Sequence, residues 1–341
     1  MNFYDGGIIM NYEKVQLLMN NSKELDKAGG IFTVNSFRKC NALTLTLKDK
    51  KADANRINEA IKIIKKNTTL MSNFRGNNLF TTAITISLEN DMESSFKELM
   101  NIYEKLKSFF FANQYLILAA IVIFNARNRV NIDDAVKNTR EVYEEMRKNH
   151  RFLTGHEDVS AAAMIATTST NIEITLNETE ECYEALRSNG FSAGNNTQSL
   201  SHILPLFNGS AYEKSIMVLK IQNALRDNKV PLKNYSIPLL GVAAFINDDP
   251  NIFAKEVREV SDRLKQENGF GMFALGATIR NMIAIGLVAS DYINRLNDAD
   301  NQKLINTTNN IALTIQLAIE VAVASASAGA AAAAASSSSG S

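Results

Sequence analysis

The chain of 341 residues contains little of several residue types that often indicate a class of protein. It has no tryptophan, two cysteines, three histidines, 16 glycines and 4 prolines, and 36 basic side chains balance 36 acidic ones. The few glycines and prolines argue against a turn-rich all-β protein and favour long helices. A net charge of zero gives no overall attraction to nucleic acid or anionic lipid. The hydrophobic share of 45% excludes a disordered chain.

The cysteines and the apolar runs indicate where the protein is found. Cys40 and Cys182 show neither a CxxC pair nor a zinc-type Cys/His spacing, so we expect buried, reduced thiols. Residues 1–14 lack the basic region, apolar core and cleavage site of a secretory signal. The longest internal apolar run, 115–124, is about half the length that a bilayer span needs. We therefore predict a cytoplasmic protein without nucleic-acid or membrane partners.

A repeat with a period near 40 residues runs through the chain. Polar helical segments can be superimposed so that an apolar anchor falls near the end of each helix. The anchors are Leu106, Met146, Leu186, Leu225 and Leu264, at spacings of 40, 40, 39 and 39 residues. Extending the pattern backward adds Ile64 and Leu25. A fixed period near 40 in a helical chain indicates stacked helical hairpins.

Capping residues agree with this register. A helix that ends near each anchor should begin with a side chain that accepts hydrogen bonds from the amides of the first turn. Reading back 15 or 16 positions gives Asp49, Asn90, Asn131, Thr170, Ser210 and Asp249. Thr170 and Ser210 are each followed three residues later by Glu, as in a capping box. We therefore predict that a first helix begins at each of these positions.

Each anchor is followed by a short polar turn and a second, more apolar helix. We expect one apolar side chain of each turn to pack inward, at Phe111, Phe152, Phe191, Val230 and Phe270. Amphipathic first helices and apolar second helices indicate an outer and an inner layer. The predicted fold is all-α, with about seven hairpins in an α-solenoid or α/α superhelix. The pattern allows an open stack or one that closes toward a toroid.

We predict a single domain for this chain. The helical-hairpin repeats occupy residues 1–308, an amphipathic C-terminal helix covers 309–324, and an Ala/Ser-rich low-complexity tail covers 325–341. Gln316 and Glu320 within the last apolar stretch argue against a C-terminal tail anchor.

The histidines are the first candidates for acid/base or metal chemistry, because the chain has no GxxxxGK[ST] and no HExxH. The candidate catalytic residues are His150, His156, Glu157, Asp158 and His202. The competing interpretation is structural. His150 at a helix end and the acids at the next helix start suit the helix dipoles, and Thr154 with Glu157 matches a capping box. We predict no metal and no cofactor.

The turns before the second helices should lie on one rim of a regular stack, and their polar side chains form a row. Rims and concave faces of helical solenoids are common binding surfaces. The candidate partner-binding residues are Arg75, Asn77, Asn78, Asn113, Tyr115, Asn195, Asn196, Asn234 and Tyr235. Turns are also polar because they meet water, so each residue has a structural explanation as well.

The stretches 74–89, 96–123 and 142–166 resemble those of domain of unknown function 4003, an uncharacterised bacterial family found mainly in Firmicutes. The resemblance covers nearly the whole chain. Its most specific part is a Met-ending helix, His-x-Phe-Leu-Thr and an acidic pair, matched by Met146, His150, Phe152, Leu153, Thr154, Glu157 and Asp158. The family usually has an aromatic residue and a proline next, where this chain has Val159 and Ser160. The resemblance implies a cytosolic bacterial protein without an assigned activity.

Three functions are consistent with the sequence. The first is a binding or scaffold module for a protein or peptide, because a helical repeat occurs here without a catalytic motif. The second is a helical-toroid enzyme that uses the histidine and acidic residues named above. The third is a structural protein that assembles with itself. For this third function, residues 1–75 hold 13 Lys/Arg against 7 Asp/Glu, while residues 89–184 hold 10 against 17.

Overall fold

The computed structural model describes residues 4–28, 35–245 and 249–297, and these residues are all helix, turn or loop. They form fourteen α-helices in seven hairpins, which we number as units 1 to 7, and contain no strand. The all-α prediction is therefore confirmed. The predicted helix at 309–324 and the tail at 325–341 lie outside the described residues.

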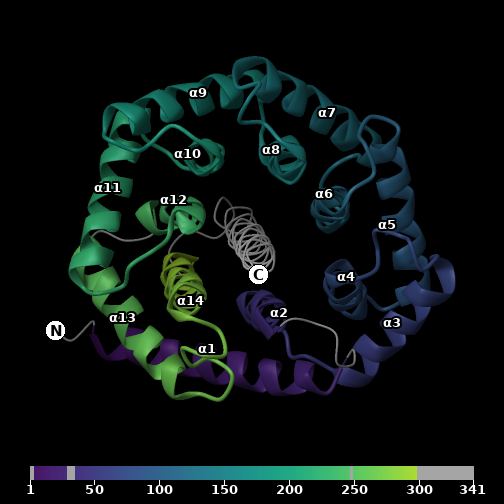
Figure 1. The fold of residues 1–341 in the computed structure, drawn as a ribbon, viewed down its shortest axis with the longest axis horizontal. Coiled ribbons are helices and arrows are strands. Elements are labelled where there is room, and N and C mark those ends of the chain that lie inside the picture. Colours follow the sequence, from purple (N-terminus) through teal and green to yellow (C-terminus); the bar gives the residue numbers. More distant parts are fainter. Residues whose placement is uncertain (1–3, 29–34, 246–248, 298–341) are drawn as a thin grey trace, which may run out of the picture.

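The first helices of the hairpins form an outer layer and the second helices an inner layer (Figure 1). The outer helices are α1 (Tyr4–Asp26), α3 (Ala54–Asn67), α5 (Met92–Lys107), α7 (Ile132–Asn149), α9 (Ile172–Ser188), α11 (Ala211–Asp227) and α13 (Pro250–Gln266). The inner helices are α2 (Asn35–Leu47), α4 (Asn77–Ser87), α6 (Gln114–Ala126), α8 (Val159–Thr168), α10 (Asn195–Ser201), α12 (Pro238–Phe245) and α14 (Ala277–Asn297). Short 3₁₀ helices, η1 (His156–Asp158), η2 (Leu204–Leu206) and η3 (Asn234–Ser236), flank three inner helices.

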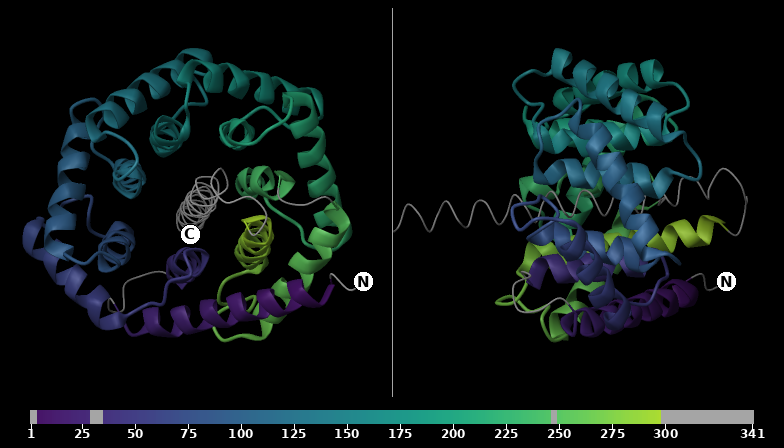
Figure 2. Two further views of the ribbon diagram at one scale, coloured as in Figure 1. Left: turned by 180° about the vertical axis from the view of Figure 1, so that it is seen from behind. Right: turned by 90° about the vertical axis from the view of Figure 1, so that its right-hand side faces the viewer.

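The last hairpin packs against the first, so that the two layers form a ring (Figures 1 and 2). Helix α14 contacts both α1 and α2. Asn35 Nδ2, at the start of α2, donates hydrogen bonds to the carbonyls of Gly269 (3.1 Å) and Ala274 (3.0 Å). Lys14 Nζ donates to Ser290 Oγ at 3.0 Å. Residues more than 230 positions apart therefore join the two ends of the repeat.

The closing contact requires a residue without a side chain at position 269. Gly269 has φ +81°, and a Cβ there would lie 3.0 Å from Cε of Lys39. Lys39 is buried, lies over the ring of Phe270 and hydrogen-bonds Ser22. A larger residue at 269 would strain the backbone and also displace this lysine.

The buried anchors confirm the register of the repeat. The seven residues at the predicted positions lie near the ends of the outer helices and are at most 2% exposed: Leu25, Ile64, Leu106, Met146, Leu186, Leu225 and Leu264. In the inner layer, α6 is buried at every position from Leu116 to Phe124, which explains why that run has no polar face.

Three of the predicted helix starts are confirmed. Asn131, Ser210 and Asp249 are the N-caps of α7, α11 and α13. Ser210 forms the predicted capping box, because Glu213 Oε2 accepts from the Ser210 amide at 2.9 Å while Ser210 Oγ accepts from the Glu213 amide at 3.3 Å. The repeat spacing and the capping side chains together predicted where these three helices begin.

At the other three starts the prediction was wrong by one to four residues. The caps are Asp53, Asp91 and Asn171 rather than Asp49, Asn90 and Thr170. In each case a second residue with a hydrogen-bond-accepting side chain lies nearby, and the sequence does not distinguish between them.

The inward-facing residues of the turns are predicted correctly in three units and wrongly in two. Phe191, Val230 and Phe270 are buried. Phe111 and Phe152 are 84% and 97% exposed. In unit 3 the neighbouring Phe110 packs inward instead, edge-on to Tyr143 of α7 with ring centroids 5.2 Å apart.

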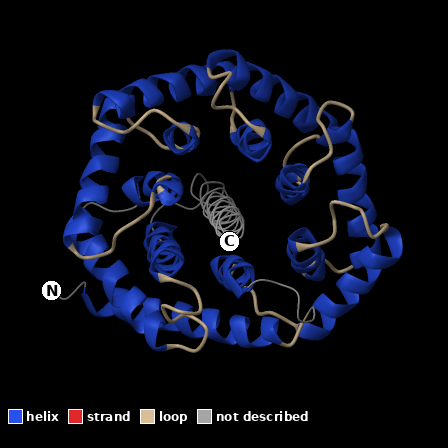
Figure 3. Ribbon diagram, in the orientation of Figure 1, coloured by secondary structure: helices blue, strands red, loops and turns tan. Residues whose placement is uncertain are grey.

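In units 2 to 7 the turns that lead from an outer to an inner helix lie on one rim, which we call the turn rim (Figure 3). Direct contacts join the starts of neighbouring inner helices there. Asn78 Nδ2 donates to the Gln114 carbonyl at 3.0 Å, and Asn195 Nδ2 donates to Glu157 Oε1 at 3.4 Å. Both contacts link one inner-helix start to the next around the ring.

The two cysteines are buried and no disulfide joins Cys40 to Cys182. Burial raises the pKa of the Cys182 thiol to about 12.

Over the described ranges, no helix combines the length and the apolar character required to cross a bilayer.

Two phenylalanines in the same turn test the importance of ring closure. Phe270 is fully buried at the contact between units 7 and 1, whereas Phe273 is fully exposed. We expect Phe270→Ala to lower the free energy of unfolding by about 3–5 kcal/mol, because it empties a buried aromatic site. Phe273→Ala should change it by less than about 0.5 kcal/mol. Urea unfolding followed by circular dichroism measures both, and equal losses would contradict the closure described here.

Candidate functional site

His150 connects two outer helices. It is the C-cap of α7, and its Nε2 lies 2.7 Å from Glu180 Oε2 on α9. Its ring also packs on Tyr183 of α9, with centroids 4.5 Å apart. The side chain is only 15% exposed. His150 therefore holds the end of outer helix α7 against the next outer helix, α9.

The turn at residues 150–158 packs against α10, and this brings several of the candidate catalytic residues together. Asn195 Nδ2 donates to Glu157 Oε1, and Gln198 Nε2 donates to Thr154 Oγ1 at 3.0 Å. His202 follows on the same helical face, because residues three and four apart are neighbours on a helix. We call this contact between residues 150–158 and 195–202 the unit 4–5 joint.

His202 is enclosed in the joint. It is 1% exposed, and its Nδ1 forms no hydrogen bond. Burial, with a smaller contribution from the charge of nearby His150, lowers the pKa of His202 to about 3. The imidazole is therefore neutral at neutral pH.

Asp158 is also enclosed. It is 5% exposed, and its Oδ2 accepts a hydrogen bond from the Gly155 amide at 2.8 Å. Burial raises the pKa of Asp158 to about 7, the Gly155 amide opposes this shift, and the charge of Glu157 adds to it. The capping box predicted for Thr154 and Glu157 was wrong, because Asp158 bonds the Gly155 amide instead.

The joint supports packing better than catalysis. The carboxyl of Asp158 and the imidazole of His202 are buried, while His156 on η1 is exposed. Within the ranges that the structure describes, no three His, Cys, Asp or Glu side chains are placed so that they could hold a metal ion. The candidate residues are thus divided between a buried contact and the surface.

Several candidate residues of the turn rim stabilise the turns themselves. Arg75 donates to the carbonyls of Lys65 (2.9 Å) and Thr68 (2.6 Å) and so holds the end of α3. Asn113 caps α6, and Asn78 forms the link to Gln114 described above.

The remaining rim candidates differ in exposure. Asn77 and Asn195 are exposed. Tyr115 and Tyr235 are half-buried and pack against the hydrophobic core. Exposure alone therefore does not single out one of these residues as a binding site.

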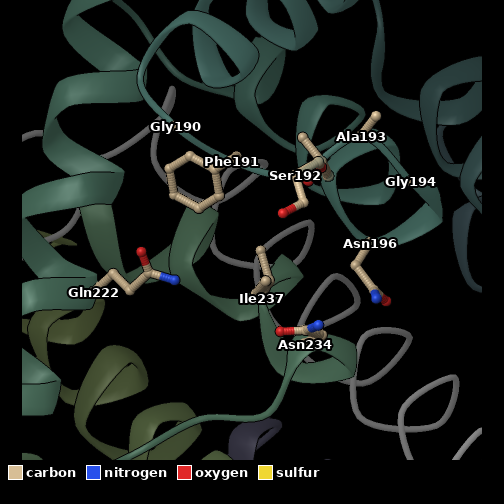
Figure 4. A pocket seen from close by; sticks show the side chains of 10 residues that line it. Gly190, Phe191, Ser192, Ala193, Gly194, Asn196, Gln222, Asn234 and Ile237 are labelled. Atoms are coloured by element: carbon tan, nitrogen blue, oxygen red, sulfur yellow. Dashed lines mark hydrogen bonds between the residues drawn. The ribbon is translucent and has the colours of Figure 1, made fainter.

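A pocket opens on the turn rim between units 5 and 6, with a volume of about 200 Å³ (Figure 4). We call it the rim pocket. Its lining residues come from the turn before α10, the start of α10, the middle of α11, and η3 with the residue that follows it. They are Gly190, Phe191, Ser192, Ala193, Gly194, Asn196, Thr197, Gln222, Asn234 and Ile237.

Hydrogen-bonding groups without charge dominate the chemistry of the rim pocket. None of its lining side chains is ionisable. Figure 4 shows Ser192, Gln222 and Asn234 arranged around Ile237. Thr197 Oγ1 donates to the Ser192 carbonyl at 2.7 Å and holds the turn in place. The pocket therefore offers donors and acceptors beside the apolar side chains of Phe191 and Ile237.

Sequence reasoning found part of this pocket. Asn196 and Asn234 were in the predicted rim row, but Ser192 and Gln222 were not. Gln222 lies in the middle of an outer helix, where polar residues usually meet only solvent, and no local pattern marks it. Only the packing of unit 6 on unit 5 brings it to the rim.

A family comparison identifies the group to which this ring belongs. The model of DUF4003, a protein of unknown function, matches residues 21–322. The chain belongs to this family. The resemblance seen in the sequence is thereby confirmed, and the family description assigns no activity.

One curated relative is similar in sequence to this chain. The uncharacterised protein YeaA of Bacillus subtilis (strain 168) is 26% identical over 223 residues, which cover 64% of this chain and 67% of the relative. No solved structure matches the chain. Function must therefore be argued from the geometry above.

Asp158 and His202, the two buried titratable groups of the joint, should have opposite effects on how the free energy of unfolding changes with pH. The pKa of Asp158 is raised from 3.8 to about 7, so between these values the folded chain keeps a proton that the unfolded chain has released, and stability falls as pH rises. The pKa of His202 is lowered from 6.5 to about 3, so over that range only the unfolded chain binds the proton, and stability rises with pH.

Single substitutions should separate these effects. Relative to the wild type, the free energy of unfolding of Asp158→Asn should rise between about pH 4.5 and 6.5, and that of His202→Gln should fall, each by up to about 1.4 kcal/mol per pH unit. Urea unfolding at several pH values measures both, with Glu184→Gln as the control for removing an exposed carboxyl outside the joint. Differences that are flat, or that share one sign, would contradict the assignment.

Proposed function

We propose that the chain is a binding module that holds a neutral peptide segment of a partner protein in the rim pocket. The supporting observation is a set of three amide side chains, Asn196, Gln222 and Asn234, at one opening. None of the three side chains hydrogen-bonds another of the described residues. Their donors and acceptors are therefore available to a ligand.

The chemistry of the pocket favours a peptide. An amide side chain carries a donor and an acceptor side by side, as does a backbone peptide group, so the two can pair. A charged ligand would find no opposite charge in the lining and would lose hydration without compensation. A neutral segment that brings its own amide or hydroxyl groups avoids this cost.

The size of the pocket agrees with this ligand class. At about 200 Å³ it is smaller than the roughly 300–1,000 Å³ typical of sites for drug-sized molecules. It suits one or two residues of a longer chain. Ile237 and Phe191 supply apolar contact, and the glycines at 190 and 194, with φ of 92° and 152°, shape a turn whose backbone is open to the ligand.

Peptide selection tests the proposal. A phage-displayed library of random peptides is selected on the immobilised full chain, and the affinities of the selected synthetic peptides are measured by calorimetry. We expect neutral peptides with Asn, Gln, Ser or Thr near the centre. Gln222→Leu and Asn234→Leu should each weaken binding about tenfold, because each removes a hydrogen bond worth about 1–1.5 kcal/mol without a large change in volume.

Asn77→Leu is the matched control, because Asn77 is an exposed asparagine on the rim of unit 2. It should change the affinity less than about twofold. Peptides that bind Gln222→Leu and Asn234→Leu as well as the wild type, or a selection that yields no binding peptide, would overturn the proposal.

A further inference from the structure

Units 2, 3 and 4 carry bare apolar side chains on the turn rim. Leu70 and Met71, in the turn after α3, are 84% and 94% exposed. Phe111, after α5, is 84% exposed, and Phe152, after α7, is 97% exposed. We call these four residues the apolar rim patch. Single exposed apolar residues are common, but several on neighbouring turns indicate an interaction surface.

The three turns are neighbours in the ring. Asn78 joins the turn of unit 2 to the start of α6. Phe110, next to Phe111, packs on Tyr143 of α7, the helix whose end leads to Phe152. Described contacts therefore link the three neighbouring units that carry the four exposed apolar side chains.

Basic side chains accompany the patch. Lys65 and Lys66 end α3, Arg147 lies in the last turn of α7, and Arg151 lies beside Phe152. All four are exposed, and none makes an ion pair with another of the described residues. Lysine and arginine at helix ends also complement the helix dipole, but these unpaired charges remain available to an anionic surface.

We propose that the apolar rim patch docks the ring onto an anionic lipid bilayer. The inference goes beyond the proposed peptide binding, because it concerns units 2–4 rather than the pocket between units 5 and 6. Apolar tips that enter the boundary between headgroups and acyl chains, flanked by cations that stay with the anionic headgroups, are the pattern of surface-bound proteins.

The high exposure of the four apolar side chains favours a bilayer over a protein partner. Side chains that are more than four-fifths exposed stand clear of their neighbours and do not form the walls of a groove. A rigid protein surface would need matching pockets for each of them, whereas lipid adapts to separate tips. The sequence predicted no membrane partner because its net charge is zero and it lacks a spanning run, but docking needs only a local patch.

Vesicle flotation of the full chain tests this inference. The probes are vesicles of phosphatidylcholine alone and of phosphatidylcholine with phosphatidylglycerol. We expect binding to the phosphatidylglycerol vesicles that weakens as salt rises, and little binding to phosphatidylcholine alone. Phe111→Ser combined with Phe152→Ser should reduce the partition coefficient about tenfold or more. Lys65→Gln combined with Lys66→Gln should reduce it several-fold and flatten the salt dependence.

The matched control is Ile174→Ser combined with Tyr212→Ser. These residues are 62% and 66% exposed near the starts of α9 and α11, away from the turns that form the patch, and the change should alter binding less than about twofold. Circular dichroism checks that every variant is folded. No binding of the wild type to phosphatidylglycerol vesicles, or binding that Phe111→Ser with Phe152→Ser leaves unchanged, would overturn the proposal; the former would leave a protein partner as the occupant.

Discussion

The contact between the last and the first hairpin is the constraint on which the rest of the structure depends. Lys39 lies buried there, hydrogen-bonded to Ser22 and placed over Phe270. Burial lowers the pKa of Lys39, and the charge of Asp26 opposes that shift. Gly269 provides the space that the lysine occupies. With this contact in place, no repeat is a terminal one, and the described chain needs no polar capping repeat of the kind that open solenoids require.

Closure also sets the turns on a common rim and so creates surfaces that no single unit contains. The unit 4–5 joint, the rim pocket and the apolar rim patch each combine residues from at least two neighbouring units. Their chemistries differ: the joint is buried and titratable, the pocket is neutral and polar, and the patch is apolar and basic. A ring with zero net charge can therefore carry local surfaces of distinct character.

The success of sequence reasoning varied from residue to residue. The anchors were found because burial at helix ends recurs with the period of the fold, and Ser210 with Glu213 was found because a capping box is a local arrangement. Phe111 was misplaced because a turn can shift by one residue and exchange the side chain that faces the core, as Phe110 shows. Phe152 was misplaced as well, since its side chain is 97% exposed. His150 and His202 were named as candidates, but His202, at the end of α10, is buried in a joint with the turn at 150–158, which lies far back along the chain.

The sequence by itself determined the all-α class, the seven-fold repeat and the division into amphipathic outer and apolar inner helices, because these follow from local periodicity and capping. The tertiary structure alone decided that the ends meet, that Gln222 reaches the rim, and that four apolar side chains remain bare beside unpaired cations. Those outcomes depend on which faces neighbouring units bury in each other. That choice is made by packing between residues distant in the chain, which no local pattern encodes.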